Sequence, residues 1–418
     1  MSGVINLASR MEGQLPAELV SFMKSAGDTA QRKSQRLCLV GGVVRDLLLG
    51  RTNLDLDLVV EGDAITLARE LISLKQGKLA THPRFGTAKL HWDKWSVDIT
   101  TARSETYARP GALPDVKPGS IEDDLLRRDF TINAMAVELN AGRYGELLDL
   151  YGGRDDLEQG LVRTLHEKSF TDDATRIWRA IRYEQRLDFR LERNTLKLLK
   201  RDIKMLDTIS GDRIRHELEL ALKEGFPEKV LRRAGELGVL ARLHTSLIGD
   251  GWLADKFEQV RRLSTPDSPS VWLYLAFLAY RLSSEEIEQL ISYLRLPKTA
   301  AQSLWDTINL KLKLKSLDRP ELAPSSIYSL LHGYVPTALT ANALASKSKI
   351  DKEHIEQYLS KLRYVRPALT GEDLKRLGIA PGPRIKEILN LLREARLDGR
   401  VKTKKDEERL VEGWVIKE

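Results

Sequence analysis

Hydrophobic and polar positions follow two different periods along the chain, and the change falls near residue 140. Before that point, short runs of β-branched, aromatic and aliphatic residues are separated by Gly, Pro and Asn, a pattern typical of strands. The predicted strands lie in residues 36–42, 54–62, 87–92 and 95–101. Between them, residues 63–77 carry apolar side chains at helical spacing. This part of the chain is therefore predicted to be α/β, with a small mixed sheet.

After residue 140, apolar positions recur at a spacing of three and four residues, and Gly or Pro interrupts the pattern between segments. The main predicted helices lie in residues 173–187, 211–225, 227–243, 270–282, 284–296 and 382–397. The predicted organisation is a helical extension (1–36), an α/β head (37–148), a helical neck (149–225) and a helical body and tail (226–418). The expected fold class is thus an α/β head followed by an all-α neck, body and tail.

Composition narrows the class of protein. No run approaches the roughly 18 apolar residues of a membrane helix, and the N-terminal residues lack the basic start and apolar core of a signal peptide. The single cysteine, Cys38, excludes an intrachain disulfide and a cysteine-based zinc site. We therefore expect a cytoplasmic protein without membrane association. The 67 Lys and Arg residues outnumber the 60 Asp and Glu residues, a modest excess that permits a polyanionic partner.

The strongest chemical signal lies in the first two predicted strands. One strand runs into Gly41–Gly42 and a helix with Arg45, and the next strand carries Asp55 and Asp57. Carboxylates two residues apart on a strand face the same way, so this pair can share two Mg²⁺ ions, as phosphoryl transfer requires. The glycines let the backbone approach a triphosphate. Taken singly, two strand aspartates are more often surface residues. Asp98, on a neighbouring predicted strand, is either a third carboxylate or a salt-bridged or capping residue.

Five segments in a fixed order extend this signal. They are GGVVRDLLLG with LDLDLVV (41–60), EDDLLRRDFTINAMAV (122–137), DLYGGRDDL (149–157), DDATRIWRAIRYEQRL (172–187) and RIRHEL (213–218). The series resembles the five motifs of the class II tRNA nucleotidyltransferase and bacterial poly(A) polymerase family. The resemblance covers residues 37–220, and the rest of the chain shares the family's helical character and a C-terminal segment, 369–383. It implies a DNA polymerase beta-like head, and helical neck, body and tail domains.

The second motif supplies a grip for phosphates. Arg127, Arg128 and Asp129 precede a predicted helix in residues 130–137. Arginine suits this role because its planar donors carry a permanent charge. The resemblance implies that Arg128 contacts the incoming nucleotide and that Asn133 holds its ribose side. The same resemblance implies that the first motif, through Gly42 and Arg45, holds the triphosphate. Outside the motif series, the two arginines would be read as a solvated surface turn.

The fourth motif predicts base selection. If a helix begins at Asp172 or Asp173, then Arg176, Arg179 and Arg182 follow at steps of three and form a spiral basic ridge beside Asp173. A solvated face of an amphipathic helix is the alternative. A carboxylate accepts from the amino group of cytosine or adenine, while Arg176 donates to the ring nitrogen beside it. Guanine and uracil present a carbonyl and an N–H in the opposite sense, and each mismatch costs about 1–3 kcal/mol. Arg179 and Arg182 would support the nucleotide or its phosphates.

Two further features concern an RNA partner. The Pro- and Gly-rich residues 103–120 take the place of the family's flexible loop. The tail carries basic residues that could follow a phosphate backbone, although each is as well explained as part of a solvated helix face. These residues are Arg384, Lys386, Arg393, Arg396, Arg400 and 402–405.

The sequence therefore predicts a template-independent nucleotidyltransferase that adds C and/or A from CTP and ATP to the tRNA 3′ end. Its cofactor would be two Mg²⁺ ions held by Asp55 and Asp57. The products CCA, CC alone and A alone share these motifs, so all three stay open. The alternatives are an RNA adenylyltransferase of the poly(A) polymerase type and a non-catalytic RNA-binding scaffold. No protein partner is implied.

Overall fold

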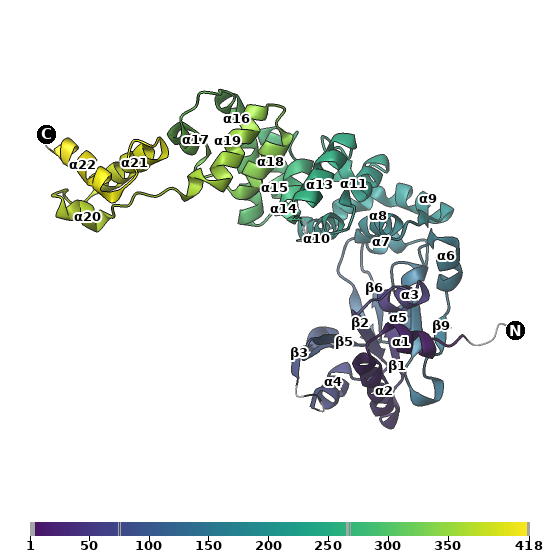
Figure 1. Ribbon diagram of the computed structural model, residues 1–418. Helices are drawn as coiled ribbons and strands as arrows, with labels where there is room; N and C mark the ends of the chain where they lie inside the picture. Colours follow the sequence, from purple (N-terminus) through teal and green to yellow (C-terminus); the bar gives the residue numbers. More distant parts are fainter. Residues whose placement is uncertain (1–4, 74, 76, 265–266, 268, 416–418) are drawn as a thin grey trace. The chain divides into compact units, whose positions relative to one another are not determined.

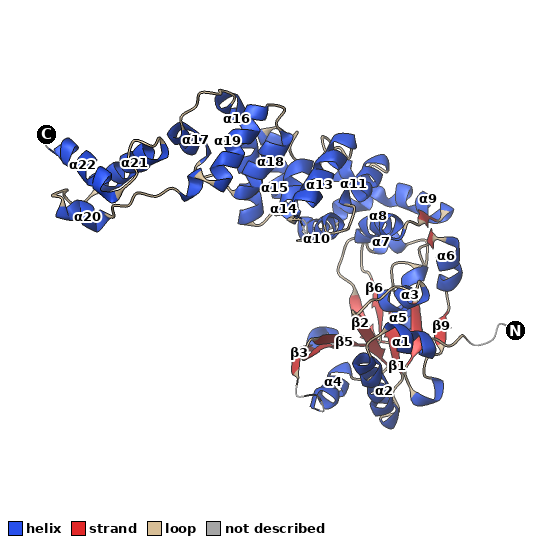
Figure 2. Ribbon diagram, viewed as in Figure 1, coloured by secondary structure: helices blue, strands red, loops and turns tan. Residues whose placement is uncertain are grey.

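The computed structural model describes residues 5–73, 75, 77–264, 267 and 269–415. The chain forms two compact units, Met1–Arg242 and Leu243–Glu418 (Figure 1). Within the described residues, every strand lies in the first unit and the second is helical (Figure 2). The expected α/β head followed by helices is confirmed. The finer boundaries at residues 36, 148 and 225 stay predictions.

A seven-stranded mixed sheet forms the head, in the order β3-β4-β5-β2-β1-β8-β9. Its strands are β1 (Leu37–Val40), β2 (Leu56–Val60), β3 (Lys78–His82), β4 (Thr87–Trp92), β5 (Trp95–Thr101), β8 (Met135–Glu138) and β9 (Leu147–Asp149). The pair β2 and β5 is parallel and the other neighbours are antiparallel. All four predicted strands are therefore present, as β1, β2, β4 and β5.

One prediction about the head is wrong. Residues 130–137 were expected to be helical, but Thr131–Asn133 form a single 3₁₀ turn, η2, and β8 follows directly. All four residues of β8 are buried between β1 and β9. A strand that is buried on both faces lacks the alternation that marks a strand in sequence, so its apolar run resembles that of a buried helix.

Helices cover both faces of the sheet. The helices of the first unit are α1 (Ala8–Gln14), α2 (Ala17–Arg32), α3 (Gly42–Leu48), α4 (Ala64–Ser73), α5 (Ile121–Leu126), α6 (Gly153–Gln159), α7 (Ser169–Asp172), α8 (Thr175–Leu187), α9 (Arg193–Asp202), α10 (Gly211–Leu222) and α11 (Pro227–Glu236). Through Ile121 and Leu125, α5 packs on Cys38, Val40 and Val59, on the face of the sheet that also carries Asp57. Two small ribbons complete the unit: β6 (Arg103–Thr106) with β7 (Asp115–Pro118), and β10 (Leu161–Val162) with β11 (Arg190–Leu191).

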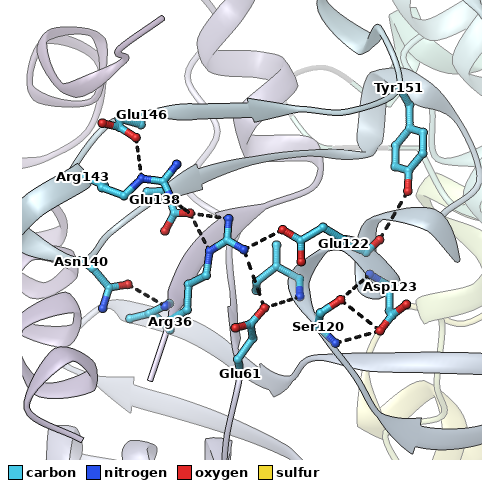
Figure 3. Close-up of polar contacts among 12 residues, drawn as sticks. Arg36, Glu61, Ser120, Glu122, Asp123, Glu138, Asn140, Arg143, Glu146 and Tyr151 are labelled. Atoms are coloured by element: carbon cyan, nitrogen blue, oxygen red, sulfur yellow. Dashed lines mark hydrogen bonds and ion pairs between the residues drawn. The ribbon is translucent and has the colours of Figure 1, made fainter. Parts of the chain in front are cut away.

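An ion-pair network fixes α5 against the start of β1 (Figure 3). Arg36 Nη1 contacts Glu122 of α5 at 2.7 Å, and its Nε donates to Glu138 of β8 at 2.6 Å. Glu61, 3.8 Å from the same guanidinium, accepts from the backbone N–H of Ile121 at 2.7 Å. One arginine thus joins carboxylates of α5, of β8 and of the residue that follows β2, and it holds the helix that leads into the second motif.

The second unit consists of helices packed on apolar cores. They are α13 (Gly251–Ser264), α14 (Val271–Leu278), α15 (Ser284–Leu294), α16 (Lys298–Leu317), α17 (Pro324–Leu331), α18 (Pro336–Ala345), α19 (Lys349–Ser360), α20 (Gly371–Arg376), α21 (Pro383–Leu397) and α22 (Lys404–Val415), and a short helix, α12 (Leu240–Leu243), precedes them at the boundary. One core lies around Leu310, Leu331 and Ile355, and a smaller one around Leu374 and Leu392. In the described part of the chain, no helix has the length and hydropathy needed to cross a membrane.

Candidate active site

A cleft of about 550 Å³ lies in the first unit, between the sheet, the β6/β7 ribbon and the start of α8. Six of the predicted site residues line it: Gly42, Asp57, Arg128, Asp173, Arg176 and Arg179. Arg45, Asp55 and Arg182 are not among its lining residues. Residues from the first, second and fourth motifs, more than 100 positions apart in the chain, therefore meet in one cleft.

Three carboxylates lie near one another at this end of the sheet, and of the three only Asp57 is among the lining residues of the cleft. Asp57 lies in β2, and Asp55 is exposed one residue before the strand. Asp98 of β5 is the direct register neighbour of Asp57 in the parallel pair, so both side chains face the same side of the sheet. Asp98 also accepts from Lys89 Nζ at 2.9 Å. Asp98 thus joins the carboxylate cluster and is salt-bridged at the same time.

This crowding affects protonation. Burial, followed by the negative charges of Asp55 and Asp98, raises the pKa of Asp57 to about 6, although Arg128 and Lys89 act in the opposite direction. A positive charge placed beside Asp57 would therefore stabilise its ionised form. Within the described residues, no group of three or more His, Cys, Asp or Glu side chains is arranged to hold a metal. Mg²⁺ is usually bound by one or two carboxylates together with substrate phosphates, so the pair Asp55 and Asp57 fits that ion.

A glycine brings the backbone close to Arg128. Gly41 has a φ of +80°, and a Cβ there would lie 3.1 Å from Arg128 Nη1 and 3.6 Å from Asp57 Oδ2. Any side chain at this position would be strained by the backbone and crowded by the guanidinium. Because Gly41 has no side chain, the space between Arg128, Asp57 and the backbone of Gly41 stays free for a ligand.

A buried carboxylate of α5 orients both arginines of the second motif. Asp124 is fully buried and accepts from Arg127 Nη2 at 2.7 Å and from Arg128 Nη2 at 2.9 Å. Burial alone would raise the pKa of Asp124, but the two guanidinium groups outweigh it and hold the pKa below its ordinary value. Arg128 Nε is buried and finds no hydrogen-bond partner among the described residues.

Arg45 makes its hydrogen bonds to other protein side chains. Its side chain is buried, with Nε and Nη2 donating to Asp46 at 2.9 Å each and Nη1 donating to Asn133 at 2.7 Å. Asn133 in turn donates to Asp129 at 3.1 Å and lines the cleft. In this arrangement Arg45 lies behind the cleft and orients Asn133. Its proposed contact with a triphosphate stays a prediction.

Asp129 connects the second motif to the fourth. Both Nε and Nη2 of Arg179 donate to Asp129 Oδ2, at 2.8 and 2.6 Å. Burial of Asp129 would raise the pKa of its carboxyl, but Arg179 and Asn133 outweigh burial, hold the pKa below its ordinary value and keep the carboxyl ionised. The ring of Tyr183 lies against this pair, 5.8 Å from the Arg179 guanidinium, and also lines the cleft.

The two residues expected to read the base both line the cleft. Asp173 lies between α7 and α8, so the helix expected to begin at Asp172 or Asp173 begins at Thr175 instead. Three hydrogen bonds reach Asp173 Oδ1: from the N–H and the hydroxyl of Thr175 at 3.0 and 2.7 Å, and from Arg213 Nη2 at 2.8 Å. Arg176 is buried and donates from Nη1 to Ser169 Oγ at 2.8 Å and from Nη2 to the carbonyl of Arg127 at 2.7 Å. Both side chains are thus held in one orientation.

Arg182, by contrast, faces one acidic residue of α10 and another just after the end of that helix. Its guanidinium lies 3.6 Å from both Glu217 and Glu224. Sequence reasoning also missed cleft residues on the β6/β7 ribbon. Glu105 accepts from Arg127 Nη1 at 3.1 Å and from the hydroxyl of Tyr107 at 3.0 Å. Residues 103–120 were identified from their place between the motifs, as the counterpart of the family's flexible loop, but no sequence pattern pointed to Glu105 or Tyr107.

Comparison with known proteins agrees with this geometry. Residues 37–163 match the family described as Poly A polymerase head domain, and residues 188–247 match the family described as Probable RNA and SrmB- binding site of polymerase A. The first match contains the carboxylates and the second motif. The second match begins directly after α8.

Individual relatives cover the whole chain. An A-adding tRNA nucleotidyltransferase of Halalkalibacterium halodurans is 33% identical over 96% of this chain and 94% of the relative. Another, of Geobacter sulfurreducens, is 35% identical over 97% of this chain, which spans about half (48%) of that relative's length. The solved apo form II of a CCA-adding enzyme superposes with a TM-score of 0.83 at 32% identity, covering 99% of this chain and 100% of the other. The chain belongs to the family of tRNA nucleotidyltransferases and bacterial poly(A) polymerases.

Proposed function

We propose that the protein adds A and/or C from ATP or CTP to the 3′ end of tRNA without a nucleic-acid template and releases pyrophosphate. One observation carries the proposal. The same cleft holds the Asp57 carboxylate and Arg128 beside an open glycine, and the fixed pair Asp173 and Arg176. A site with a phosphate end and a base-reading end, both built from protein, needs no template strand.

The phosphate end performs the transfer. Asp55 and Asp57 would hold two Mg²⁺ ions, which neutralise the leaving pyrophosphate and activate the attacking hydroxyl. Arg128 Nη1, directed toward Gly41, binds the triphosphate. Asp124 keeps this guanidinium in place before the nucleotide arrives, so little reorganisation is needed on binding.

The other end reads the base. The three hydrogen bonds described for Asp173 all end on Oδ1, so Oδ2 can accept from the amino group of adenine or cytosine. Arg176 donates to the neighbouring ring nitrogen. Because Asp173 is already held by Thr175 and Arg213, guanine and uracil would place a carbonyl against a fixed carboxylate and lose a hydrogen bond. Of the possible products, addition of the terminal A is the one we favour, since the two curated relatives described above are A-adding enzymes.

Incorporation of each labelled nucleotide into three tRNA transcripts, ending at the discriminator base, at C and at CC, tests the function. Addition of a single A to the CC acceptor alone is the expected result. Extension of all three acceptors to CCA would assign the complete activity, and C without A would assign the CC-adding one. Long A tails on diverse RNA ends would favour the poly(A) polymerase alternative. No incorporation in the presence of Mg²⁺ would favour the non-catalytic RNA-binding scaffold.

The cytoplasmic location stays a prediction.

A further inference from the structure

A second cleft, of about 430 Å³, lies on the other side of the β6/β7 ribbon. Its lining is mostly apolar and glycine-rich, with Pro83, Phe85, Val116, Pro118, Gly62, Gly86 and Gly119. Its charged lining residues are Arg84, Arg103 and Asp63, and Arg103 lines the candidate active site as well. An apolar cleft of this size with a few polar groups is typical of a ligand site.

An exposed aromatic ring stands at this cleft. Phe85, in the turn η1 (Pro83–Phe85) between β3 and β4, is 48% exposed. The guanidinium carbon of Arg84 lies 5.5 Å from the centre of the ring, and within the described residues Arg84 forms no ion pair. An exposed ring beside an arginine without an acidic partner is the arrangement on which proteins stack bases and hold phosphates of single-stranded nucleic acid.

Arg103 adds a donor on the opposite wall. Its Nη2 pairs with Glu105 at 3.0 Å, while its Nε is buried and has no hydrogen-bond partner in the described part of the chain. The third charged group, Asp63, caps the first turn of α4, accepting from the N–H groups of Ile65 and Thr66 at 2.9 and 3.1 Å. The cap holds this carboxylate in its ionised form. A phosphate would therefore lie on the arginine side of the cleft.

The strand order places this cleft on one side of the carboxylates. Gly41, which faces Arg128 Nη1, follows β1 at the Asp57 end of β2, whereas the η1 turn lies beyond β5 in the strand order and at the Thr100 end of that strand. Phosphoryl transfer is in line, so the attacking hydroxyl approaches opposite the leaving pyrophosphate. An RNA strand whose end meets the leaving group in line would extend away from Gly41, and the turn with Phe85 lies on that side of Asp98.

We propose that the second cleft binds one nucleotide of the RNA substrate upstream of its 3′ end. The base stacks on Phe85, and the adjoining phosphates face Arg84 and Arg103. Arg103, shared by both clefts, connects the bound strand to the site of transfer. The inference rests on the proposed function, because it takes RNA as the substrate whose end reacts.

Four variants separate stacking from charge and from folding. Phe85→Ala removes the ring, and Phe85→Trp restores a stacking surface. Arg84→Ala removes the cation, and Lys78→Ala is its matched control, because Lys78 is an exposed lysine at the far end of the same β3–β4 hairpin. For each, one measures the KM for a tRNA transcript ending at CC, the KM for ATP, the thermal midpoint, and the affinity for the same fluorescein-labelled transcript by anisotropy at several salt concentrations.

Phe85→Ala is expected to raise the KM for tRNA and to weaken its binding by about 5- to 100-fold, with the KM for ATP and the thermal midpoint unchanged, and Phe85→Trp is expected to recover most of the loss. Arg84→Ala is expected to reduce the salt dependence of binding by about one phosphate contact, and Lys78→Ala is not.

An unchanged affinity for tRNA in Phe85→Ala would overturn the proposal, and so would a rise in the KM for ATP instead of that for tRNA. If the wild-type protein adds no nucleotide to any acceptor, the proposed function fails. The anisotropy measurement still decides in that case whether Phe85 binds RNA.

Discussion

Replacing Asp57 by asparagine should make the metal-free protein more stable at neutral pH while abolishing its activity. In the folded state burial and the neighbouring carboxylates raise the pKa of Asp57 to about 6, against an ordinary value of 3.8. A group whose pKa is raised on folding destabilises the folded state as pH increases, beginning above the unfolded value and reaching its full effect above the folded one. The cost therefore develops between about pH 4 and pH 6 and persists at higher pH.

The magnitude follows from the difference of about two pKa units. Each unit corresponds to about 1.4 kcal/mol, so the ionised carboxylate costs up to about 3 kcal/mol at pH 8. For a unit of this size, 1 kcal/mol changes the thermal midpoint by roughly 2–4 °C. Asp57→Asn should thus melt several degrees above the wild-type protein at pH 8 and at nearly the same temperature at pH 4.

The assay is thermal unfolding of both proteins from pH 4 to pH 8, with EDTA and with MgCl₂. With Mg²⁺ the wild-type midpoint at pH 8 should rise toward that of the variant, because the ion supplies the missing counter-charge, whereas the variant should respond little. Asp28→Asn, at an exposed position of α2, is the control and should follow the wild-type profile. Parallel pH profiles for Asp57→Asn and the wild type would refute the reasoning.

Three other perturbations test the remaining parts of the site. Arg176→Ala should lower kcat/KM for the correct nucleotide by about 10- to 100-fold and for GTP and UTP far less, and an equal loss for all four nucleotides would assign it a structural or phosphate role. Arg179→Ala leaves Asp129 buried without its cation, so the free energy of unfolding should fall by about 3–5 kcal/mol at pH 8. The loss should be smaller at pH 4, because burial without the cation raises the pKa of Asp129 in the variant and lets its carboxyl take up a proton; Asp129→Asn in the same chain should recover part of the loss in urea denaturation. Arg36→Met removes the guanidinium that lowers the pKa of Glu122 below its ordinary 4.5, so the thermal midpoint should fall more at pH 6 than at pH 3, and a pH-independent loss would mean that packing, not charge, dominates.

Much of the head could be predicted because its central strands alternate or carry short apolar runs between turn residues. The edge strand β3 gave no such signal, since none of its five residues is buried. The opposite case, β8, is buried at every position and resembled a helix. The hydrophobic pattern thus failed to indicate β3 and indicated a helix in place of β8, because alternation marks a strand only when one of its faces is buried and the other is exposed.

The candidate site shows the same limit at the level of side chains. Spacing along the chain identified Asp57, Arg128 and Arg176, and all three line one cleft. The partners of each charge were not predictable, because they come from elements far apart in sequence. Arg45 has the same residue type as Arg128, but its hydrogen bonds to Asp46 and Asn133 place it behind the cleft. Only tertiary contacts distinguish an arginine that lines the cleft from one whose donors are taken up by other protein groups.

The strand order also governs how the head assembles during synthesis. β1 lies between β2 and β8, and β9 completes that side of the sheet only at Asp149. At about 5–20 residues per second, the 78 residues from Val60 to Glu138, the end of β8, take roughly 4 to 16 s to emerge. During this interval β1 has an open edge of unpaired N–H and C=O groups, the kind of edge that pairs with other chains. A fragment that ends before β8 should therefore aggregate, whereas one that extends past β9 carries its own protection, with Arg36 and Glu138 joining the two central strands.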